Sequence, residues 1–329
     1  MRLLITGVAG FVGRHFLRAI ATEGAPDAHG ADRAPLDVAP DAPDTPDTEE
    51  LKSGLKSYRT LDVSDPAAVA ACVREVKPDH VLHLAAQASG AISFTNPAET
   101  YNVNAMGTVH LLEAVRLEAP KATVLIVGSA DVYGSGAGNP IAEDAPLRPR
   151  NPYSVSKAAQ DMLGELYAGT YGLRVIRTRT FSHTGPGQRP TFALAGFADQ
   201  LARIDAGAAP PEVKTGNLEP VREYGDVRDV ARAYIALLEQ GEPGEAYNVC
   251  SGVGYPMREL LDRLIKISGV RATVVSDPAR LRARDADYLV GDPSKIRART
   301  GWAPAISIER TLLDLYRDAR ERVRLTSGR

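Results

Sequence analysis

Apolar and polar positions follow two alternating patterns along most of the chain. The run from Leu3 to Ile5 has the length and composition of a buried strand, and the residues from Phe11 to Ile20 follow a helical pattern. The same alternation continues beyond them. It predicts strands over 28–33, 58–63, 79–86 and 122–129, and helices over 66–75, 97–118, 153–170, 228–240 and 308–324. Strands that alternate with helices predict an α/β fold with a parallel, doubly wound sheet.

Three glycines, at G-x-x-G-x-x-G spacing, separate the first strand from the first helix. A dinucleotide pyrophosphate needs one glycine for a tight turn, one for close approach of backbone N–H groups, and one for close packing of helix on strand. The motif therefore predicts a Rossmann-type cofactor site at this turn. The residues expected to hold the pyrophosphate are Gly7, Gly10, Phe11, Val12 and Gly13.

The preference between NAD and NADP depends on two neighbouring residues. Asp32 lies 19 residues after Gly13, close to where a carboxylate accepts hydrogen bonds from the adenosine ribose. That carboxylate would repel a 2′-phosphate, which favours NAD, whereas Arg33 could bind such a phosphate and keeps NADP open. Further cofactor contacts are expected at the carboxyl ends of the next two strands, where ligands of these sheets bind. They are Asp62, Val63, Leu84, Ala85 and Ala86.

A tyrosine and a lysine stand four residues apart, at Tyr153 and Lys157. On a helix the two side chains lie on one face, one turn apart. A free phenol has a pKa of ~10, and a nearby ammonium lowers it by favouring the phenolate. Tyr153 would then serve as an acid or base at neutral pH. Ser129, at the end of the strand over 122–129, could donate a hydrogen bond to a substrate carbonyl or alcohol.

Together, the glycine motif, the Leu84-Ala85-Ala86 segment, Ser129 and the Tyr153–Lys157 pair resemble the extended short-chain dehydrogenase/reductases that act on nucleotide sugars. Residues 179–188 resemble the Phe-Asn-His-x-Gly-Pro-Gly-Gln motif of one branch of the NAD-dependent epimerase/dehydratase family. This branch contains GDP-mannose 4,6-dehydratases and GDP-4-keto-6-deoxymannose reductases. Three more segments resemble the same branch, at 216–230, 248–252 and 281–302. Two of them, 248–252 and 281–302, resemble its reductases most closely.

The resemblance implies two lobes. Residues 1–180 would form the NAD(P)-binding Rossmann domain, with 222–245 packing back onto it. Residues 181–221 and 246–329 would form a smaller α/β lobe that binds a nucleoside-diphosphate sugar, GDP-linked in this branch. The acidic segment 35–50 lies outside the resemblance, and we expect it to be an exposed insertion.

The resemblance also implies substrate contacts and a partner. Arg222 and Arg282 would pair with the diphosphate, because a planar guanidinium selects such anions. The resemblance further implies a homodimer, joined by a four-helix bundle of the helices over 98–118 and 153–170. The other residues expected at the substrate are Gln87, Ser182, His183, Phe192, Phe197, Asn217 and Asp285.

Two departures from the family pattern bear on the reaction. Ser182 stands where the family usually has Asn. Ala130 and Asp131 follow Ser129, whereas dehydratases of the family carry Thr followed by Ser-Glu or Asp-Glu. There the carboxylate removes the C5 proton and its partners help to expel the C6 hydroxyl. Ala130 has no proton to give, and Asp131 is one methylene shorter than Glu; a misplacement of ~1 Å can cost ~100-fold in rate.

These departures favour NAD(P)H-dependent reduction of the C4 keto group of a GDP-4-keto-6-deoxy sugar, with Ser129, Tyr153 and Lys157 as catalytic residues. Three alternatives stay open. A GDP-mannose 4,6-dehydratase would use Asp131 as its base. A nucleotide-sugar 4-epimerase would keep NAD bound, which suits Asp32. A non-catalytic nucleotide sensor on the same fold is disfavoured, because such proteins tend to lose the Tyr–Lys pair.

Composition excludes several other classes. A net charge of −2 gives no reason to expect nucleic acid or an anionic membrane as partner, and no apolar run approaches the ~18 residues of a membrane span. Cys72 and Cys250 lie far apart among apolar residues, which predicts core thiols and no metal site. His80 and His83 alternate with apolar positions and are expected to pack in the core. The first strand leaves no room for a signal peptide, so we expect a cytoplasmic protein.

Overall fold

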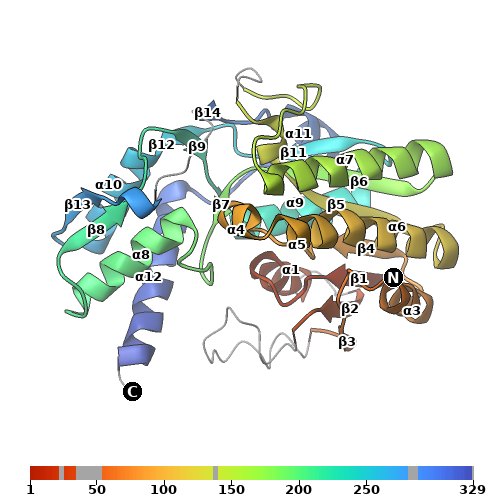
Figure 1. Cartoon of the computed structure of the whole chain (residues 1–329), viewed down its shortest axis with the longest axis horizontal. Helices are drawn as coiled ribbons and strands as arrows, with labels where there is room; N and C mark the ends of the chain where they lie inside the picture. Colours follow the sequence, from red (N-terminus) through yellow and green to blue (C-terminus); the bar gives the residue numbers. More distant parts are fainter. Residues whose placement is uncertain (22–25, 35–53, 136–139, 281–287, 328–329) are drawn as a thin grey trace.

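The computed structural model describes residues 1–21, 26–34, 54–135, 140–280 and 288–327 (Figure 1). The whole of the predicted acidic insertion at 35–50, and two predicted substrate residues, Arg282 and Asp285, lie outside the described residues.

Seven parallel strands form the central sheet, in the order β11-β6-β5-β4-β1-β2-β3. The strands are β1 (Arg2–Thr6), β2 (Asp27–Asp32), β3 (Ser57–Thr60), β4 (His80–His83), β5 (Thr123–Ser129), β6 (Arg174–Thr180) and β11 (Ala246–Val249). The chain builds one half of the sheet outward from β1 and then returns to β4 on its other side. This reversal of direction creates a switch point between β1 and β4, where ligands of such sheets bind. The predicted doubly wound parallel sheet is confirmed.

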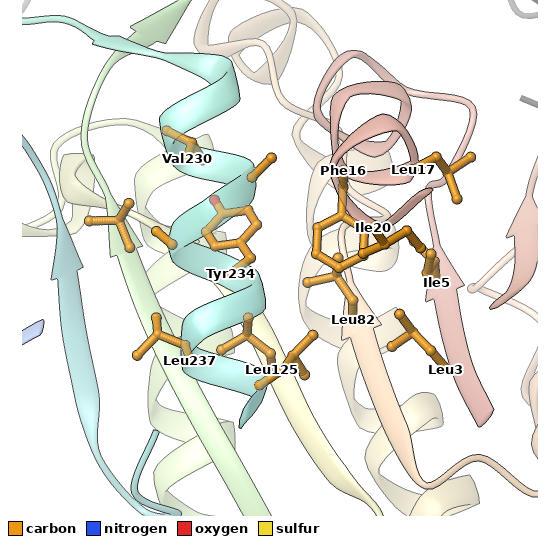
Figure 2. Packing of buried hydrophobic residues seen from close by; sticks show 14 of the residues in the cluster. Leu3, Ile5, Phe16, Leu17, Ile20, Leu82, Leu125, Val230, Tyr234 and Leu237 are labelled. Atoms are coloured by element: carbon orange, nitrogen blue, oxygen red, sulfur yellow. The ribbon is translucent and has the colours of Figure 1, made fainter. Parts of the chain in front are cut away.

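Helices cover both faces of the sheet. On one face lie α1 (Phe11–Ala21), α9 (Val227–Gln240) and α11 (Ser294–Thr300), and on the other lie α3 (Pro66–Val76), α6 (Gly107–Glu118) and α7 (Pro152–Tyr171). The alternation of side chains along β1 serves both layers: Leu3 and Ile5 pack with Phe16 and Tyr234, whereas Leu4 faces the α3–α6 layer. Figure 2 shows α1 and α9 meeting over the strands. The sheet is therefore buried on both sides.

The predicted helix over 97–118 consists of three consecutive pieces. They are α5 (Pro97–Tyr101), the π-helical turn η2 (Asn102–Met106) and α6. The short helix α4 (Gly90–Thr95) precedes them, and all four pack beside α7. π-helical turns often occur at functional sites, and this one adjoins the N-terminal half of α7.

A second core lies beside the sheet, between α8 (Ala193–Asp205), α10 (Met257–Ser268) and α12 (Ile308–Ser327). Three small sheets accompany these helices: β10-β7, β12-β9-β14 and β13-β8. Their strands are β7 (His183–Thr184), β8 (Glu212–Thr215), β9 (Val221–Glu223), β10 (Gly225–Asp226), β12 (Gly254–Pro256), β13 (Thr273–Ser276) and β14 (Tyr288–Leu289). Two 3₁₀ turns, η3 (Ala130–Tyr133) and η4 (Pro278–Arg280), complete the described elements.

One domain boundary differs from the sequence-based expectation. Residues 246–329 were expected to belong wholly to the smaller lobe, but β11 pairs with β6 and forms an edge of the large sheet. Ile296 and Trp302 also pack in the core beneath α9. The reason is physical: β6 would otherwise be an exposed edge strand, and a short apolar run late in the chain covers it.

Two further expectations concern buried and membrane segments. Cys72 and Cys250 are both buried free thiols, as predicted for core residues. A search of the helices in the described ranges finds none with the length and apolar character needed to cross a membrane.

A buried ion cluster ties α7 to the sheet. The carboxylate of Asp161 accepts from Arg177 Nη1 at 3.0 Å and from Arg179 Nε at 2.8 Å, and the three side chains are at least 92% buried. Arg179 also donates to the hydroxyl of Tyr133, at 3.1 Å. Asp161 thus neutralises two guanidinium groups below the helix that carries Tyr153.

Replacing Asp161 by Asn should strongly destabilise the fold, because both arginines would remain buried without their carboxylate. We expect a loss of about 3–5 kcal/mol in the free energy of unfolding, measured by urea denaturation. The matched control is Glu165→Gln. Glu165 also binds Arg177, but its side chain is 69% exposed, and its loss should cost at most ~1 kcal/mol. Equal effects of the two variants would contradict this account.

Candidate active site

The turn after β1 is shaped by two glycines. Gly7 has φ +74°, and a Cβ at this residue would lie 2.6 Å from the backbone nitrogen of Ala85. A Cβ at Gly13 would lie 2.4 Å from the carbonyl oxygen of Val8. Gly7 therefore permits the turn and its contact with the segment after β4, and Gly13 lets α1 pack on the turn. This geometry agrees with the predicted division of roles and fits a dinucleotide pyrophosphate at the start of α1, where Phe11 and Val12 lie.

Asp32 points into this turn. Its carboxylate accepts a hydrogen bond from the backbone N–H of Ala9 at 2.9 Å. Burial raises the pKa of the Asp32 carboxyl, and the hydrogen bond from Ala9 opposes that rise. Arg33 points outward and forms an exposed ion pair with Glu99 at 3.1 Å. The Asp32 carboxylate, which would bind an adenosine ribose, is thus held by the glycine loop. The Arg33 side chain lies outside the core.

The other predicted cofactor residues follow β3 and β4. Both strands end earlier than expected, at Thr60 and His83, so these residues lie in the loops beyond the sheet. Asp62 Oδ1 accepts from the backbone N–H and the hydroxyl of Ser64, which lowers the pKa of its carboxyl. Val63 is buried against Gly107, whereas Leu84, Ala85 and Ala86 remain partly exposed.

The start of α7 positions Tyr153 and Lys157, the predicted catalytic pair. Asn151 caps the helix: its side chain accepts from the backbone N–H of Ser154 at 2.7 Å, and the hydroxyl of Ser154 accepts from the N–H of Asn151 at 3.0 Å. Pro152 follows the cap, where its missing N–H costs nothing. Tyr153 consequently lies in the first turn of α7, and Lys157 one turn further, beside the end of β5.

Ser129 and Tyr153 meet at the end of β5. Their hydroxyls share a hydrogen bond, and Ser129 Oγ also accepts from the backbone N–H of Asp131 at 3.2 Å. Asp131 itself is exposed, and its carboxylate acts electrostatically on Tyr153. Ala130 is buried in the core beside Tyr133. The structure therefore brings Ser129, Tyr153 and Asp131 together.

The pKa of Tyr153 differs from the sequence-based expectation. Burial raises the pKa of the phenol, the Asp131 carboxylate raises it further, and only the Ser129 hydrogen bond opposes them. Lys157 was expected to lower this pKa, but its ammonium donates to the carbonyl of Val127 at 2.9 Å and to Gln160 Oε1 at 2.8 Å. Burial also lowers the pKa of Lys157 to about 7. Desolvation thus dominates both groups and favours their neutral forms.

Several buried polar residues at this site were missed by the sequence analysis. Asn104, in the π-helical turn, donates to Ser156 Oγ at 2.9 Å and to the carbonyl of Gln87 at 3.1 Å. Thr108 and Gln160 continue the polar network toward Lys157. The available signal was the i, i+4 spacing of Asn104 and Thr108 on the buried side of a predicted helix. His83 is buried in the same network, as expected for a packed histidine.

The segment after β6 lies against the cofactor turn. The ring of His183 is parallel to that of Phe11, with their centroids 6.2 Å apart, and its Nδ1 is hydrogen-bonded to the carbonyl of Phe181 at 3.0 Å. Ser182 precedes it and is partly exposed. The side chain of Gln87, in the loop after β4, is held by hydrogen bonds to the backbone of Ser89 at 2.6 and 3.0 Å.

The remaining predicted substrate residues lie in the smaller lobe. Arg222, on β9, is 9% exposed. Asn217 borders a cavity of about 500 Å³, which is also lined by Leu218 and Arg258. Phe192 precedes α8 at the N-cap position and is exposed. Phe197, on the apolar face of α8, is 6% exposed within the α8–α10–α12 core, and its contact with substrate stays a prediction.

With this geometry described, comparison with known proteins decides the family. The sequence profile of the GDP-mannose 4,6 dehydratase family matches residues 4–315. The chain belongs to this family.

Similar proteins match the chain over almost its whole length. The GDP-6-deoxy-D-mannose reductase of Pseudomonas aeruginosa is 35% identical over 98% of both chains. The structure of RMD from Pseudomonas aeruginosa complexed with NADPH has a TM-score of 0.83 and 34% identity, covering 98% of this chain and 99% of that one. A dTDP-glucose 4,6-dehydratase of Streptomyces venezuelae with NAD bound has a TM-score of 0.84 and 28% identity, covering 98% and 97%. The predicted family is confirmed.

Gly7→Ala should abolish cofactor binding, because the added methyl group would collide with the backbone at Ala85 and open the pyrophosphate turn. Binding can be followed by the fluorescence of a reduced nicotinamide dinucleotide. Gly172→Ala is the matched control: Gly172 also has positive φ, +67°, but its Cβ would meet no atom within 4 Å. The control should lose about 1–3 kcal/mol of stability from backbone strain and still bind cofactor. Undiminished binding by the Gly7 variant would refute the assignment.

Proposed function

We propose that this chain catalyses the NAD(P)H-dependent reduction of the C4 keto group of a GDP-4-keto-6-deoxy sugar. One observation carries the proposal: Ser129, Tyr153 and Lys157 meet at the end of β5 in a chain that matches a GDP-6-deoxy-D-mannose reductase over its whole length. Ala130 and Asp131, in place of the residues with which dehydratases eliminate water, support reduction over elimination.

The chain's residues fit a nicotinamide dinucleotide. Gly7 and Gly10 would admit the pyrophosphate at the start of α1, Asp32 would bind the adenosine ribose, and Lys157 the nicotinamide ribose. When bound, the reduced cofactor supplies the hydride. Asp32 favours NAD, and the outward position of Arg33 leaves room for the 2′-phosphate of NADP. Both forms occur in similar structures, one complexed with NADPH and another with NAD.

The protein groups supply the proton and stabilise the developing charge. The Tyr153 phenol carries its proton at neutral pH and would donate it to the C4 oxygen. Burial raises the pKa of the phenol, which makes it a weaker acid than a solvated tyrosine. The Ser129 hydroxyl donates a second hydrogen bond to the same oxygen as negative charge develops there. Preorganised donors of this kind are typically worth about 3–4 kcal/mol each.

The smaller lobe would bind the nucleotide. Arg222 is a largely buried guanidinium on β9, suited to the diphosphate. Asn217 and Arg258 line the cavity of about 500 Å³ nearby. His183, stacked on Phe11, joins this lobe to the cofactor turn. These positions support a nucleoside-diphosphate sugar that lies between the two lobes.

A GDP-mannose 4,6-dehydratase is a second candidate, because the Asp131 carboxylate acts on the Tyr153 phenol and so lies near the reacting carbons. The two candidates differ in what they consume. A reductase oxidises one reduced nicotinamide for each keto sugar. A dehydratase converts GDP-mannose with no added reductant, and Asp131→Asn would stop it.

Tyr153→Phe should lower turnover by about 100-fold or more, because the phenyl ring has no proton to give, and should leave cofactor binding intact. The assay is the loss of reduced-nicotinamide absorbance with GDP-4-keto-6-deoxymannose, run with NADH and NADPH in parallel. Stoichiometric oxidation by the unaltered protein supports the reductase. A fully active Tyr153→Phe variant would remove Tyr153 from the mechanism, and a lack of oxidation with either cofactor would sink the reductase.

We also propose that the protein is a homodimer joined by a four-helix bundle. The α4, α5 and η2 segments pack beside α7, and this group of helices carries a set of exposed apolar side chains. Its members are Ile92, Phe94, Tyr101, Met106, Val155, Met162 and Leu166. An exposed apolar surface of this extent is typical of an interaction face. The occupant we propose is the same face of a second copy.

Leu166→Glu should shift the protein from dimer to monomer, because it places a carboxylate within that face. The mass in solution, measured by light scattering during gel filtration, reports the change. Leu325→Glu is the control, since Leu325 is exposed to a similar degree on α12, away from α7. A monomeric unaltered protein, or a dimer that tolerates Leu166→Glu, would rule out the bundle.

A further inference from the structure

A chain of buried polar side chains connects Lys157 to the first strand of the sheet. Lys157 Nζ donates to Gln160 Oε1 at 2.8 Å, and Gln160 Nε2 donates to Thr108 Oγ1 at 2.8 Å. His83 Nε2 lies 3.2 Å from the same Thr108 oxygen, and His83 Nδ1 lies 2.7 Å from Thr6 Oγ1. The five side chains are at most 4% exposed and come from α7, α6, β4 and β1. The cofactor turn begins directly after Thr6.

The donors and acceptors of this chain allow one consistent assignment. Thr108 gives its only hydroxyl proton to the carbonyl of Asn104, at 2.7 Å, so its oxygen must accept from both His83 Nε2 and Gln160 Nε2. His83 is then protonated on Nε2 and accepts from the Thr6 hydroxyl through Nδ1. Burial lowers the pKa of His83 to about 3, which agrees with a neutral ring. The network thereby fixes the amide of Gln160 with its carbonyl toward Lys157.

We propose that Gln160 is the positioning residue for Lys157: Thr108 and His83 hold its amide so that the carbonyl fixes the ammonium in place and keeps it charged. This inference rests on the proposed function. Val127 O and Gln160 Oε1 use two of the three N–H donors of the ammonium. The third is left for the nicotinamide ribose. Gln160 therefore acts on cofactor binding and turnover through Lys157, without touching either ligand itself.

The network holds the ammonium and does not conduct protons. An amide between Lys157 and Thr108 cannot readily pass a proton on, and the chain ends at Thr6 within the sheet. Without Gln160, only the carbonyl of Val127 would still accept from the ammonium against the effect of burial, which disfavours the charged form. Of the titratable groups nearby, His83 faces Lys157 directly from β4. The other nearby titratable groups are Tyr153, on the same helix, and the two groups that interact with its phenol, Asp131 of η3 and Tyr234 of α9.

The test is the pH dependence of cofactor binding, measured by fluorescence with NADPH and NADH over pH 5–10 and without any sugar. In the unaltered protein, affinity should fall as the pH rises through the pKa of Lys157, because the neutral amine binds the ribose less well. Gln160→Leu removes an acceptor from the ammonium, so this pKa drops and the loss of affinity should begin about one to two pH units lower. Gln160→Glu replaces the amide by a carboxylate, which favours the ammonium and should move the loss to higher pH.

Two further variants complete the design. Thr108→Val frees the amide of Gln160 while keeping both Gln160 and Lys157, and should shift the profile in the direction of the leucine variant by a smaller amount. Gln240→Leu makes the same chemical change at the exposed end of α9 and should leave the profile unchanged. Thermal unfolding identifies any variant that fails to fold. The near-isosteric Gln160→Glu variant keeps the test valid if the leucine variant is lost.

If the leucine variant loses cofactor affinity at lower pH and the glutamate variant at higher pH, the positioning role is established. If Gln160 were only structural, replacing it would change the affinity but not the pH at which affinity is lost. Profiles that superimpose on that of the unaltered protein would overturn the proposal. The outcome is independent of the sugar: if the shifts occur and no keto sugar is reduced, the proposed reductase fails and the role of Gln160 stands.

Discussion

The contact between the backbones of Gly7 and Ala85 organises the cleft. These residues follow β1 and β4, the two strands at the switch point of the sheet, and only the absence of a Cβ at Gly7 lets the two chains approach so closely. With the two turns in contact, Asp32 can reach the N–H of Ala9, and Thr6 can reach His83. The same contact sets the start of α1, on which Phe11 meets His183. The cofactor turn, the buried network and the junction of the lobes therefore share one geometric constraint.

Desolvation is the main electrostatic influence on the catalytic pair. It raises the pKa of Tyr153 and lowers that of Lys157, so both groups are driven toward neutrality. Tyr153 needs no help to remain a protonated acid at neutral pH. Lys157 does need help to stay charged, and the carbonyls of Val127 and Gln160 provide it. In the proposed reduction the phenol would act as the acid, and the raised pKa would make it a weaker proton donor than a solvated tyrosine.

Local patterns predicted the parts of the fold that depend on local physics. The strand, glycine turn and helix at the N-terminus are encoded within thirteen residues, and the Asn151 cap fixes the start of α7 within four. The parts that were wrong or missed depend on contacts distant in sequence. The place of β11 in the large sheet is set by the edge of β6.

The catalytic network shows the same limit. The spacing of Tyr153 and Lys157 predicts that they share a helical face, but it cannot reveal which acceptors the ammonium meets. Those acceptors come from β5 and from a glutamine three residues further along α7, whose orientation is set by Thr108 on another helix and His83 on another strand. A lowered pKa for Tyr153 was expected because only the charge of Lys157 was considered. Burial, which no spacing encodes, raises this pKa instead, and the Asp131 carboxylate raises it further.

The two lobes are joined by the segments that follow strands β6 and β11 of the large sheet. The residues after β6 turn directly over the start of α1, where His183 stacks on Phe11 and His15 Nε2 is hydrogen-bonded to the carbonyl of Pro186 at 2.9 Å. After β11, the N–H groups of Ser251 and Gly291 both bind the buried carboxylate of Glu223, at 2.6 and 2.8 Å. Glu223 is adjacent in sequence to Arg222. The arm that would hold the diphosphate is thus fixed to the same edge of the sheet as the catalytic pair. A nucleotide sugar bound between the lobes would then contact Arg222 and the Tyr153–Lys157 pair at the same time.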